Sequence, residues 1–242
     1  MDRALAAAAS GMAAQQRNLE TISENLANAS VVGFKGSAQR FAELIAPGRG
    51  GIGTVALGPQ ILFSQGKLAR SPGPFDLAID GPGFFAVVDA RGHRLYTRDG
   101  QFSRAADGTL RDARDDRLDG LRVPADALSL DVAPDGSVVA AFSNGKRTIG
   151  RIGLAEFPSP QHLRFVDGAL FAATPACGKP RTVTPGGDGG PKLHFGMLEE
   201  SNVTIIDAMM QILTAQRAYE ANAKGVQAAD EMLRIANNLE RA

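Results

Sequence analysis

The sequence predicts an α+β fold in which long N- and C-terminal α-helices pair as a coiled coil and the chain between them forms a central antiparallel, hairpin-rich β domain. Apolar residues recur with heptad spacing at both ends, which predicts the helices. Short strand-like runs separated by glycine-containing turns fill the middle, which predicts the β domain. The composition agrees, because 28 Gly, 13 Pro and only 6% aromatic residues in 242 are typical of many short strands and turns.

Residues 3–28 carry the first helical pattern. Apolar residues recur every seven positions and a second set follows three positions later, which is the narrow seam of a coiled coil. The first set is Leu5, Met12, Leu19 and Leu26, and the second is Ala8, Gln15 and Ile22. The helix should end in the run from Asn28 to Gly33, because its Asn, Ser, Val and Gly residues have lower helix propensities than Ala.

Residues 202–240 carry the second helical pattern. Its first heptad set is Ile205, Ile212, Tyr219, Val226 and Leu233, and its second is Ala208, Ala215, Asn222, Ala229 and Ala236. Ser201 or Asn202 is expected to cap the helix, with Asp207 in its early part. Neither helix can bury its seam alone, so we expect the two to pair with each other and then with helices of other copies. The alternative is an ordinary α+β domain whose terminal helices pack on the sheet.

The middle of the chain has the signals of antiparallel hairpins. Asp-Gly, a strong hairpin-turn signal, occurs at Asp80-Gly81, Asp99-Gly100, Asp107-Gly108, Asp119-Gly120 and Asp135-Gly136. Two glycine-rich segments, PGRGGIGTVALG before this region and PGGDGGP after it, are expected to be loops or linkers. The predicted organisation is 1–36 helix and turn, 37–70 linker and β entry, 71–185 β domain, 186–200 return linker and 201–242 helix.

Charge and cysteine content narrow the possible partners and compartments. Lys plus Arg and Asp plus Glu both number 26, so a balanced charge gives no electrostatic case for nucleic acid or an anionic membrane. The single Cys177 makes no internal disulfide, and no apolar run approaches the roughly 20 residues of a membrane span. The N-terminus lacks the apolar core of a secretory signal. We therefore expect no membrane insertion, and either a cytoplasmic protein or one exported with its N-terminus in place.

The candidate motifs for catalysis, cofactor binding and metal binding are all incomplete. Gly48-x-Gly50-x-x-Gly53 lacks the following helix that a dinucleotide site needs. Cys177 has no C-x-x-C partner and no evident base, so a loop thiol without a role is expected. The histidines His93, His162 and His194 lack the spacing of metal ligands. The aspartates Asp112, Asp115, Asp116 and Asp119 lack the spacing of a calcium-binding EF-hand loop. The sequence therefore predicts no enzyme, no cofactor and no metal. YTRDG is expected to be a structural turn.

Three separated blocks of the chain resemble the bacterial flagellar rod and hook proteins. The first is AASGMAAQQRNLETISENLANASVVGFK, the second is GPFDLAIDGPGFFAVVD with YTRDGQFS, and the third is SNVTIIDAMMQILTAQRAYEANAKGVQAADEML. Residues that match the first two blocks are Asn25, Asn28, Gly33, Phe34 and Lys35, then Asp80, Gly81, Gly83, Phe84, Phe85, Tyr96 and Arg98. Residues that match the third are Ser201, Asn202, Val203, Gln216, Arg217, Tyr219 and Glu220.

The resemblance implies a structural subunit of the flagellar basal body. It implies export by the flagellar type III apparatus without cleavage of a signal peptide, and assembly with itself and other rod or hook subunits into a hollow tube across the periplasm. The terminal helices would form the inner wall, with Gly33 able to supply a sharp bend and Phe34 to anchor the turn by burial. The predicted polymerisation seam is Leu5, Met12, Leu19, Ile22, Leu26, Ile205, Ile212, Tyr219, Val226 and Leu233.

The resemblance leaves alternatives at the level of the subunit. QRAYEANAK is similar to a distal rod subunit, whereas AADEMLRIANNLERA and the short linker favour a proximal one, to which we assign the chain on balance. A hook or hook-associated subunit is a second alternative, disfavoured by the compact β domain. A non-flagellar β-domain enzyme or carbohydrate-binding module is a third, and it would need convergent carboxylates or a metal that the sequence does not show.

Overall fold

The computed structural model describes residues 2–46, 50–187 and 189–239, which divide into two compact units. We call the first the helical unit; it contains residues 1–27, 37–62 and 203–242. We call the second the β unit; it contains residues 28–36 and 63–202. The prediction of two terminal helices and an antiparallel β-rich middle is confirmed.

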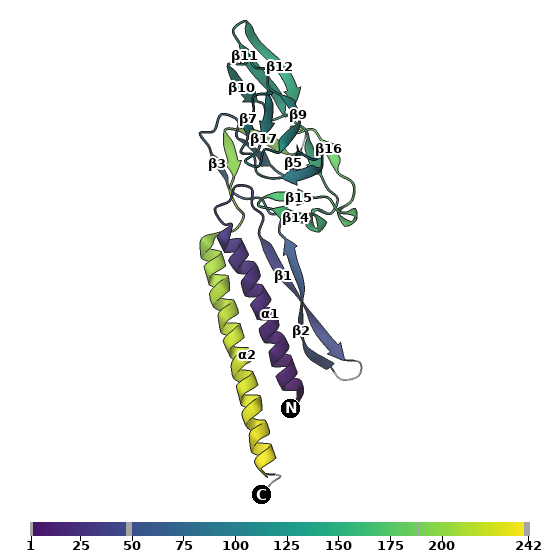
Figure 1. Cartoon of the computed structure of the whole chain (residues 1–242), viewed down its shortest axis with the longest axis vertical. Coiled ribbons are helices and arrows are strands. Elements are labelled where there is room, and N and C mark those ends of the chain that lie inside the picture. The colour runs from purple at the N-terminus through teal and green to yellow at the C-terminus, as the bar shows by residue number, and fades with distance from the viewer. Residues whose placement is uncertain (1, 47–49, 188, 240–242) are drawn as a thin grey trace. The chain divides into compact units, whose positions relative to one another are not determined.

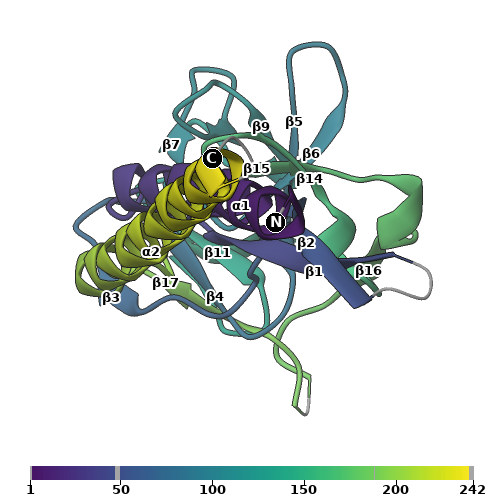
Figure 2. The ribbon, with the colours of Figure 1, turned by 90° about the horizontal axis from the view of Figure 1, so that it is seen from below.

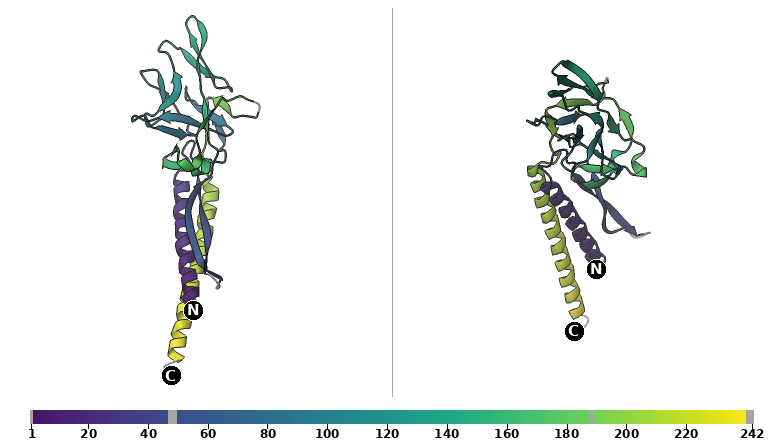
Figure 3. Two further views of the ribbon diagram at one scale, coloured as in Figure 1. Left: turned by 90° about the vertical axis from the view of Figure 1, so that its right-hand side faces the viewer. Right: turned by 45° about the horizontal axis from the view of Figure 1, so that its top comes forward.

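The helical unit consists of helix α1 (Asp2–Ala27), the hairpin of β1 (Ser37–Ala46) and β2 (Gly50–Ile61), and helix α2 (Ile205–Leu239). Helix α1 contacts both α2 and the hairpin, and it lies between them (Figures 1 and 2). The 26 residues of α1 span about 39 Å and the 35 residues of α2 about 52 Å at 1.5 Å per residue. Helix α2, distant in the sequence from the other two elements, thus runs alongside α1 (Figure 3, left).

Small residues set the contact between α1 and α2. Ala208 and Ala215 of α2 are 2% and 3% exposed and pack with Ile22 of α1. A Cβ at Gly11 would lie 2.9 Å from Nδ2 of Asn222, and one at Gly225 would lie 3.9 Å from the Cβ of Ala8. The second heptad set of α2, rich in Ala, therefore takes the positions that face α1.

The start of α2 differs from the sequence prediction. Neither Ser201 nor Asn202 caps the helix, because it begins at Ile205 and Thr204 precedes it. The Thr204 hydroxyl accepts a hydrogen bond from the backbone N–H of Asp207 at 3.1 Å, and it donates to the Asp207 carboxylate at 2.6 Å. This arrangement satisfies one of the four free N–H groups at a helix start. Asp207 does lie in the first turn, as predicted.

The first glycine-rich segment was predicted to be a loop, and this prediction is wrong from Gly50 onward. Strand β2 pairs with β1 from Ser37↔Ile61 to Ala46↔Gly50. The glycines serve close packing on α1, since a Cβ at Gly53 would lie 2.4 Å from the Ser10 hydroxyl oxygen. That hydroxyl accepts a hydrogen bond from the Thr54 N–H at 3.1 Å. A two-stranded hairpin is marginal alone, so α1 supports it. Gly48 lies outside the described residues.

The β unit contains short strands and two 3-10 turns. Their bounds are β3 (Leu68–Arg70), β4 (Leu77–Asp80), β5 (Phe84–Val88), β6 (Arg94–Thr97), β7 (Ser103–Arg104), β8 (Thr109–Arg111), β9 (Arg117–Arg122), β10 (Ser129–Val132), β11 (Ser137–Phe142), β12 (Gly145–Arg151), β13 (Leu154–Glu156), η1 (Pro160–His162), β14 (Arg164–Asp167), β15 (Leu170–Ala172), η2 (Pro175–Cys177), β16 (Arg181–Val183), β17 (Lys192–Phe195) and β18 (Met197–Glu199).

The strands of the β unit pair antiparallel in several sheets. The largest has nine strands, with the path β14-β15-β6-β5-β9-β8-β7, from which β13 pairs with β5 and β16 pairs with β13. Strands β10, β11 and β12 form a three-stranded sheet (Figure 3, right), and β4 pairs with β17 and β3 with β18. One core joins the nine-stranded sheet, the three-stranded sheet and the β4–β17 pair through the fully buried side chains of Phe85, Leu110, Val138, Ile152 and Leu193.

The Asp-Gly pairs are hairpin turns in only part of the predicted set. Asp107-Gly108 joins β7 to β8 and Asp135-Gly136 joins β10 to β11, both antiparallel pairs. The other three do not join paired neighbours: Asp80-Gly81 and Asp99-Gly100 connect strands of different pairs, and Asp119-Gly120 lies inside β9. Gly100 is required for a different reason, because a Cβ there would lie 1.6 Å from the carbonyl oxygen of Leu77.

Candidate functional site

A buried ion cluster in the β unit brings together two residues of the flagellar resemblance. Lys35 Nζ lies 2.6 Å from Glu199 Oε1, and Arg98 Nη1 lies 3.2 Å from Glu199 Oε2. The Lys35 and Glu199 side chains are 0% exposed and that of Arg98 is 5% exposed. YTRDG is therefore more than the structural turn that the sequence predicted, because its arginine is one of the two cations around a buried carboxylate.

Backbone groups complete the cluster. Lys35 Nζ also donates to the carbonyl of Ser64 at 2.8 Å, and Arg98 Nη2 donates to the carbonyl of Gly81 at 2.8 Å. The N–H of Gly66 donates to Glu199 Oε1 at 2.8 Å. Glu199 thus accepts from two side chains and one backbone group, as a buried carboxylate must to offset its desolvation.

The local chain path at the cluster requires glycine. Gly33 has φ +67°, the left-handed region, and a Cβ there would lie 2.4 Å from the backbone nitrogen of Asp99. Its N–H donates to the carbonyl of Glu199 at 2.7 Å. The position therefore needs glycine both for its φ and for close contact with the segment that carries Arg98.

The cluster holds two cations and one carboxylate. Burial lowers the pKa of Lys35, and the nearby Glu199 carboxylate opposes that change. Burial likewise lowers the pKa of Arg98, again opposed by Glu199. The Arg98 guanidinium lies over the Phe84 ring, 5.3 Å from its centroid, and among the described residues its Nε finds no hydrogen-bond partner. Glu199 is therefore the counter-charge on which both cations depend.

Two asparagines of the resemblance fasten neighbouring chain segments, each within its own unit. In the β unit, Asn202 Oδ1 accepts from the Gly36 N–H at 2.8 Å, and Asn202 Nδ2 donates to the Ser64 hydroxyl at 2.9 Å. In the helical unit, Asn25 Nδ2 donates to the Ser37 carbonyl at 2.6 Å, while Asn25 Oδ1 accepts from the Ser37 N–H at 2.9 Å. The first fastens the entry of the β unit to its exit, and the second fastens the end of α1 to the start of β1.

Aromatic residues of the resemblance pack near Arg98 in the same unit. Phe84 makes edge contacts with Phe63, Phe157 and Phe171 at centroid distances of 5.2, 6.0 and 6.1 Å. Tyr96 contacts Phe157 at 4.8 Å. Other matching residues are placed as follows: Phe34, Gly83 and Phe85 are buried, Asn28 and Gly81 are half-buried, and Asp80 is exposed.

The predicted seam is only partly brought together in a single chain. Leu19, Leu26 and Ile212 pack against the buried cluster of Ile22, Ala208 and Ala215, while Leu5, Met12 and Val226 are half-buried. Ile205 and Tyr219, which we expected in the seam, are 49% and 39% exposed. The side chain of Leu233 lies outside the described residues. Gln216, Arg217 and Glu220 of the resemblance are also exposed.

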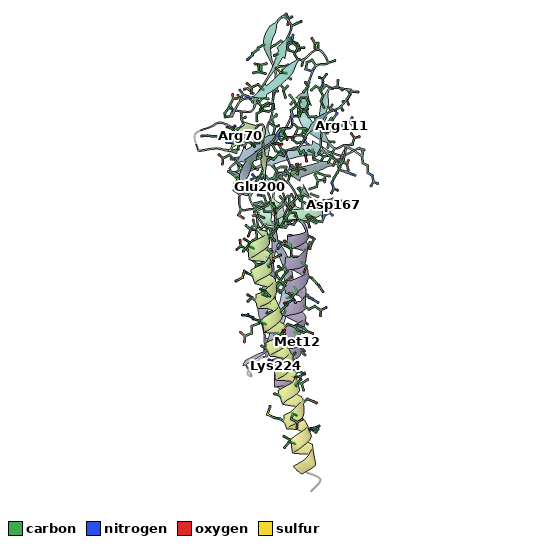
Figure 4. The ribbon with its side chains drawn as sticks, turned by 90° about the vertical axis from the view of Figure 1, so that its left-hand side faces the viewer. Met12, Arg70, Arg111, Asp167, Glu200 and Lys224 are labelled. Atoms are coloured by element: carbon green, nitrogen blue, oxygen red, sulfur yellow. The ribbon has the colours of Figure 1, made fainter. Side chains whose placement is uncertain are left out.

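Helix α2 carries an apolar face that is largely exposed in the described part of the chain. Ile206, Met209, Met210 and Leu213 are 76%, 54%, 60% and 52% exposed. Their spacing follows successive helical turns, so they form one stripe. We call these four residues the apolar stripe of α2. The side chains of the helix pair, with Met12 on α1 and Lys224 on α2 labelled, are drawn in Figure 4.

A groove between α1 and α2 lies beside the stripe. Its volume is about 340 Å³, and its floor includes the buried Ile22 and Ala215. Polar side chains and small residues form its walls: Gln15, Asn18, Gln211, Thr214 and Ala218, with Met210 at the border of the stripe. Leu213 and Ala218 are five residues apart, which separates the stripe from the groove by about 140° around the helix.

The candidate metal-binding and nucleophilic residues of the sequence are placed as follows. Within the described ranges, no three His, Cys, Asp or Glu side chains are grouped so that they could hold a metal ion. Cys177 is buried, and its thiol donates to the Thr174 carbonyl at 3.0 Å. His93 and His194 lie beside Asp89 and Asp80. Across the described part of the chain, no helix has the length and apolar character to span a membrane.

The sequence did not indicate that Glu199 and Ser64 belong to the buried ion cluster. Lys35 and Arg98 were singled out as part of the resemblance, but nothing in their local sequence pointed to a partner 164 and 101 residues away. Glu199 is followed by Glu200 in the sequence. Only the register of strand β18 determines that the first carboxylate is buried and the second is exposed.

Three family models match separate parts of the chain. Residues 5–35 match the flagella basal body rod protein model, residues 78–140 match the D1 domain model of the flagellar hook protein FlgE/F/G, and residues 196–239 match the C-terminal model of the flagellar basal body rod FlgEFG proteins. These are the three blocks on which the resemblance was based.

Relatives match over nearly the whole chain. The flagellar basal-body rod protein FlgG of Borreliella burgdorferi is 36% identical over 264 residues, which cover 100% of both chains. FlgG of Agrobacterium fabrum is 33% identical over 96% of this chain and 97% of its own. The flagellar basal-body rod protein FlgF of Mesorhizobium japonicum is 30% identical over 92% of this chain and 91% of its own.

Proposed function

Because the chain belongs to the family of flagellar basal-body rod proteins and is a structural subunit of that rod, we propose that it polymerises through its terminal helices into a hollow drive shaft that crosses the periplasm. The subunits would be exported by the flagellar type III apparatus without cleavage of a signal peptide. They would meet other copies, and other rod or hook subunits, through coiled-coil contacts of α1 and α2. Whether the chain occupies the proximal or the distal rod remains a prediction, with the proximal position favoured by the sequence.

The observation that carries this proposal is the apolar stripe of α2. A monomeric protein seldom leaves several large apolar side chains together on one helix face, because their burial is favourable by about 25 cal/mol per Å². The stripe is exposed although Ala208 and Ala215 of the same helix are buried against α1. This pattern is expected of a helix that packs on its own chain with one face and on a second copy with another.

The groove supports the same proposal and indicates which surfaces of two neighbouring copies would meet. The large side chains of the stripe from one copy would enter the groove of the next, over Ile22 and Ala215. Stripe and groove share only Met210 and otherwise consist of different residues of α2, so the contact is between two unlike surfaces. Contacts of this heterologous kind generate open helical assemblies when the rotation does not close. A hollow rod is such an assembly.

The test is a charge placed in the stripe. Leu213→Glu should abolish self-association in sedimentation velocity at rising concentration and, in cells, should leave basal bodies without a complete rod in electron cryotomography. Its circular dichroism should match the native protein, because Leu213 is 52% exposed in the single chain. The matched control is Leu128→Glu, at a 75% exposed leucine of the β unit, which should assemble normally. Normal assembly of Leu213→Glu would refute the proposal.

A further inference from the structure

Structural polymerisation does not by itself require the buried cluster of Lys35, Arg98 and Glu199. We propose that Glu199 is a closing lock, such that the β unit completes its fold only when strand β18 docks and supplies the counter-charge for both cations. The lock joins the entry of the β unit, at Gly33–Gly36, to its exit, at Glu199–Asn202. Both sides of this contact, the entry segment and the exit segment, belong to the same chain.

Glu199 supplies the negative charge that the two buried cations need. With Glu199 absent, Lys35 and Arg98 would be buried beside each other with no carboxylate among their described contacts. Burying an unpaired cation costs far more than leaving it in water. The segments that carry these two residues should therefore stay open to solvent until Glu199 arrives.

Hydrogen bonds of backbone groups also form when strand β18 docks. The carbonyl of Glu199 accepts from the Gly33 N–H at 2.7 Å, while its carboxylate accepts from the Gly66 N–H at 2.8 Å. Glu199 also pairs with Leu68 in the β18–β3 register. Asn202 adds the bonds to Gly36 and Ser64. One docking event thus satisfies charge and backbone groups of the entry and exit together, so closure should be cooperative.

Glu199 follows both cations in the sequence. Lys35 and Arg98 precede their counter-charge by 164 and 101 residues. A chain that emerges N-terminus first would carry both cations long before the lock could close. The consequence in the cell rests on the proposed function: an exported subunit would remain open until nearly its whole length has left the export channel. The chemistry of the lock itself does not depend on polymerisation.

The first experiment compares hydrogen exchange in full-length monomeric variants. Glu199→Gln keeps the shape and removes the charge, and Glu200→Gln is the control, because Glu200 is the exposed neighbour (Figure 4). We expect Glu199→Gln to accelerate exchange about tenfold or more, together, in peptides covering 31–36, 64–70, 96–100 and 196–202. Glu200→Gln should leave exchange unchanged. Equal exchange in the two variants, or opening confined to 196–202, would overturn the proposal.

A second experiment needs no variant and so covers the case in which Glu199→Gln fails to fold. Native protein is refolded from urea and pulse-labelled with deuterium at successive times. We expect protection at residues 33–36 and 196–202 to appear in one phase, after protection of the sheet of β10, β11 and β12. Protection of 33–36 before 196–202 would overturn the proposal. Neither result bears on polymerisation, which the Leu213→Glu experiment tests separately.

Discussion

Asp99 should destabilise the folded protein at neutral pH, and Asp99→Asn should relieve that effect. Burial raises the pKa of Asp99 from 3.8 to about 6, and the neighbouring carboxylates of Asp112 and Asp76 add to the rise. The hydrogen bond from the Gln101 N–H at 2.9 Å opposes it. Asparagine keeps an acceptor for that bond and carries no charge, so the substitution isolates the cost of the buried charge.

The magnitude follows from proton linkage. A pKa difference of one corresponds to about 1.36 kcal/mol, so a rise from 3.8 to about 6 is worth at most about 3 kcal/mol. The folded state holds the Asp99 proton up to about pH 6 and the unfolded state loses it near pH 4, so the contribution of Asp99 to stability falls as pH rises between these values. Above about pH 6.5 the full penalty is present.

The assay is urea unfolding followed by circular dichroism, because the chain contains no Trp. At pH 7.5, Asp99→Asn should raise the free energy of unfolding by about 1–3 kcal/mol. At pH 4 the gain should fall to about 0.5 kcal/mol. The exposed Asp126→Asn serves as the control and should change stability little at either pH. A gain of equal size at both pH values, or no gain at pH 7.5, would refute the reasoning.

Three further predictions test other parts of the structure by the same unfolding assay. Glu199→Gln leaves two buried cations unpaired and should cost about 3–5 kcal/mol, whereas Lys35→Met leaves one balanced pair and should cost less; the reverse order would contradict the charge count of the cluster. Gly33→Ala should cost more than the roughly 1–2 kcal/mol of a left-handed alanine, because its Cβ would lie 2.4 Å from a backbone nitrogen. Gly92→Ala, at φ +85° with nothing within 4 Å of the added carbon, should cost only the conformational part, and equal losses at the two sites would exclude the steric clash. Thr204→Ala should lower stability by about 0.5–2 kcal/mol through loss of the α2 cap, and an unchanged midpoint would show that the cap contributes nothing.

The helices could be predicted from the sequence because periodicity is a local property. Heptad spacing located both helices to within a few residues, but spacing alone does not say which of two heptad sets faces the partner helix. Side-chain size determines which set faces α1. Ala208 and Ala215 allow a close approach of α1, while Ile205 and Tyr219 stay exposed. Only the packed pair shows that choice.

The hairpin and the ion cluster could not be predicted because each depends on contacts distant in sequence. Glycines near Gly53 have the composition of a loop, yet they form a strand because the Ser10 side chain occupies the space that a Cβ would need. Lys35 and Arg98 were identified by resemblance, but their shared counter-charge depends on the pairing of β18 with β3. Composition carries no information about either contact.

The division of the chain into two discontinuous units has a mechanical consequence. The backbone passes from one unit to the other between residues 27 and 28, 36 and 37, 62 and 63, and 202 and 203. A force transmitted through the protein chain is therefore shared by four covalent crossings, where a domain joined by a single linker would have one. Hydrogen bonds of Asn25 and Asn202 lie next to these crossings. Cleavage at any one crossing would leave the two units covalently joined through the other three.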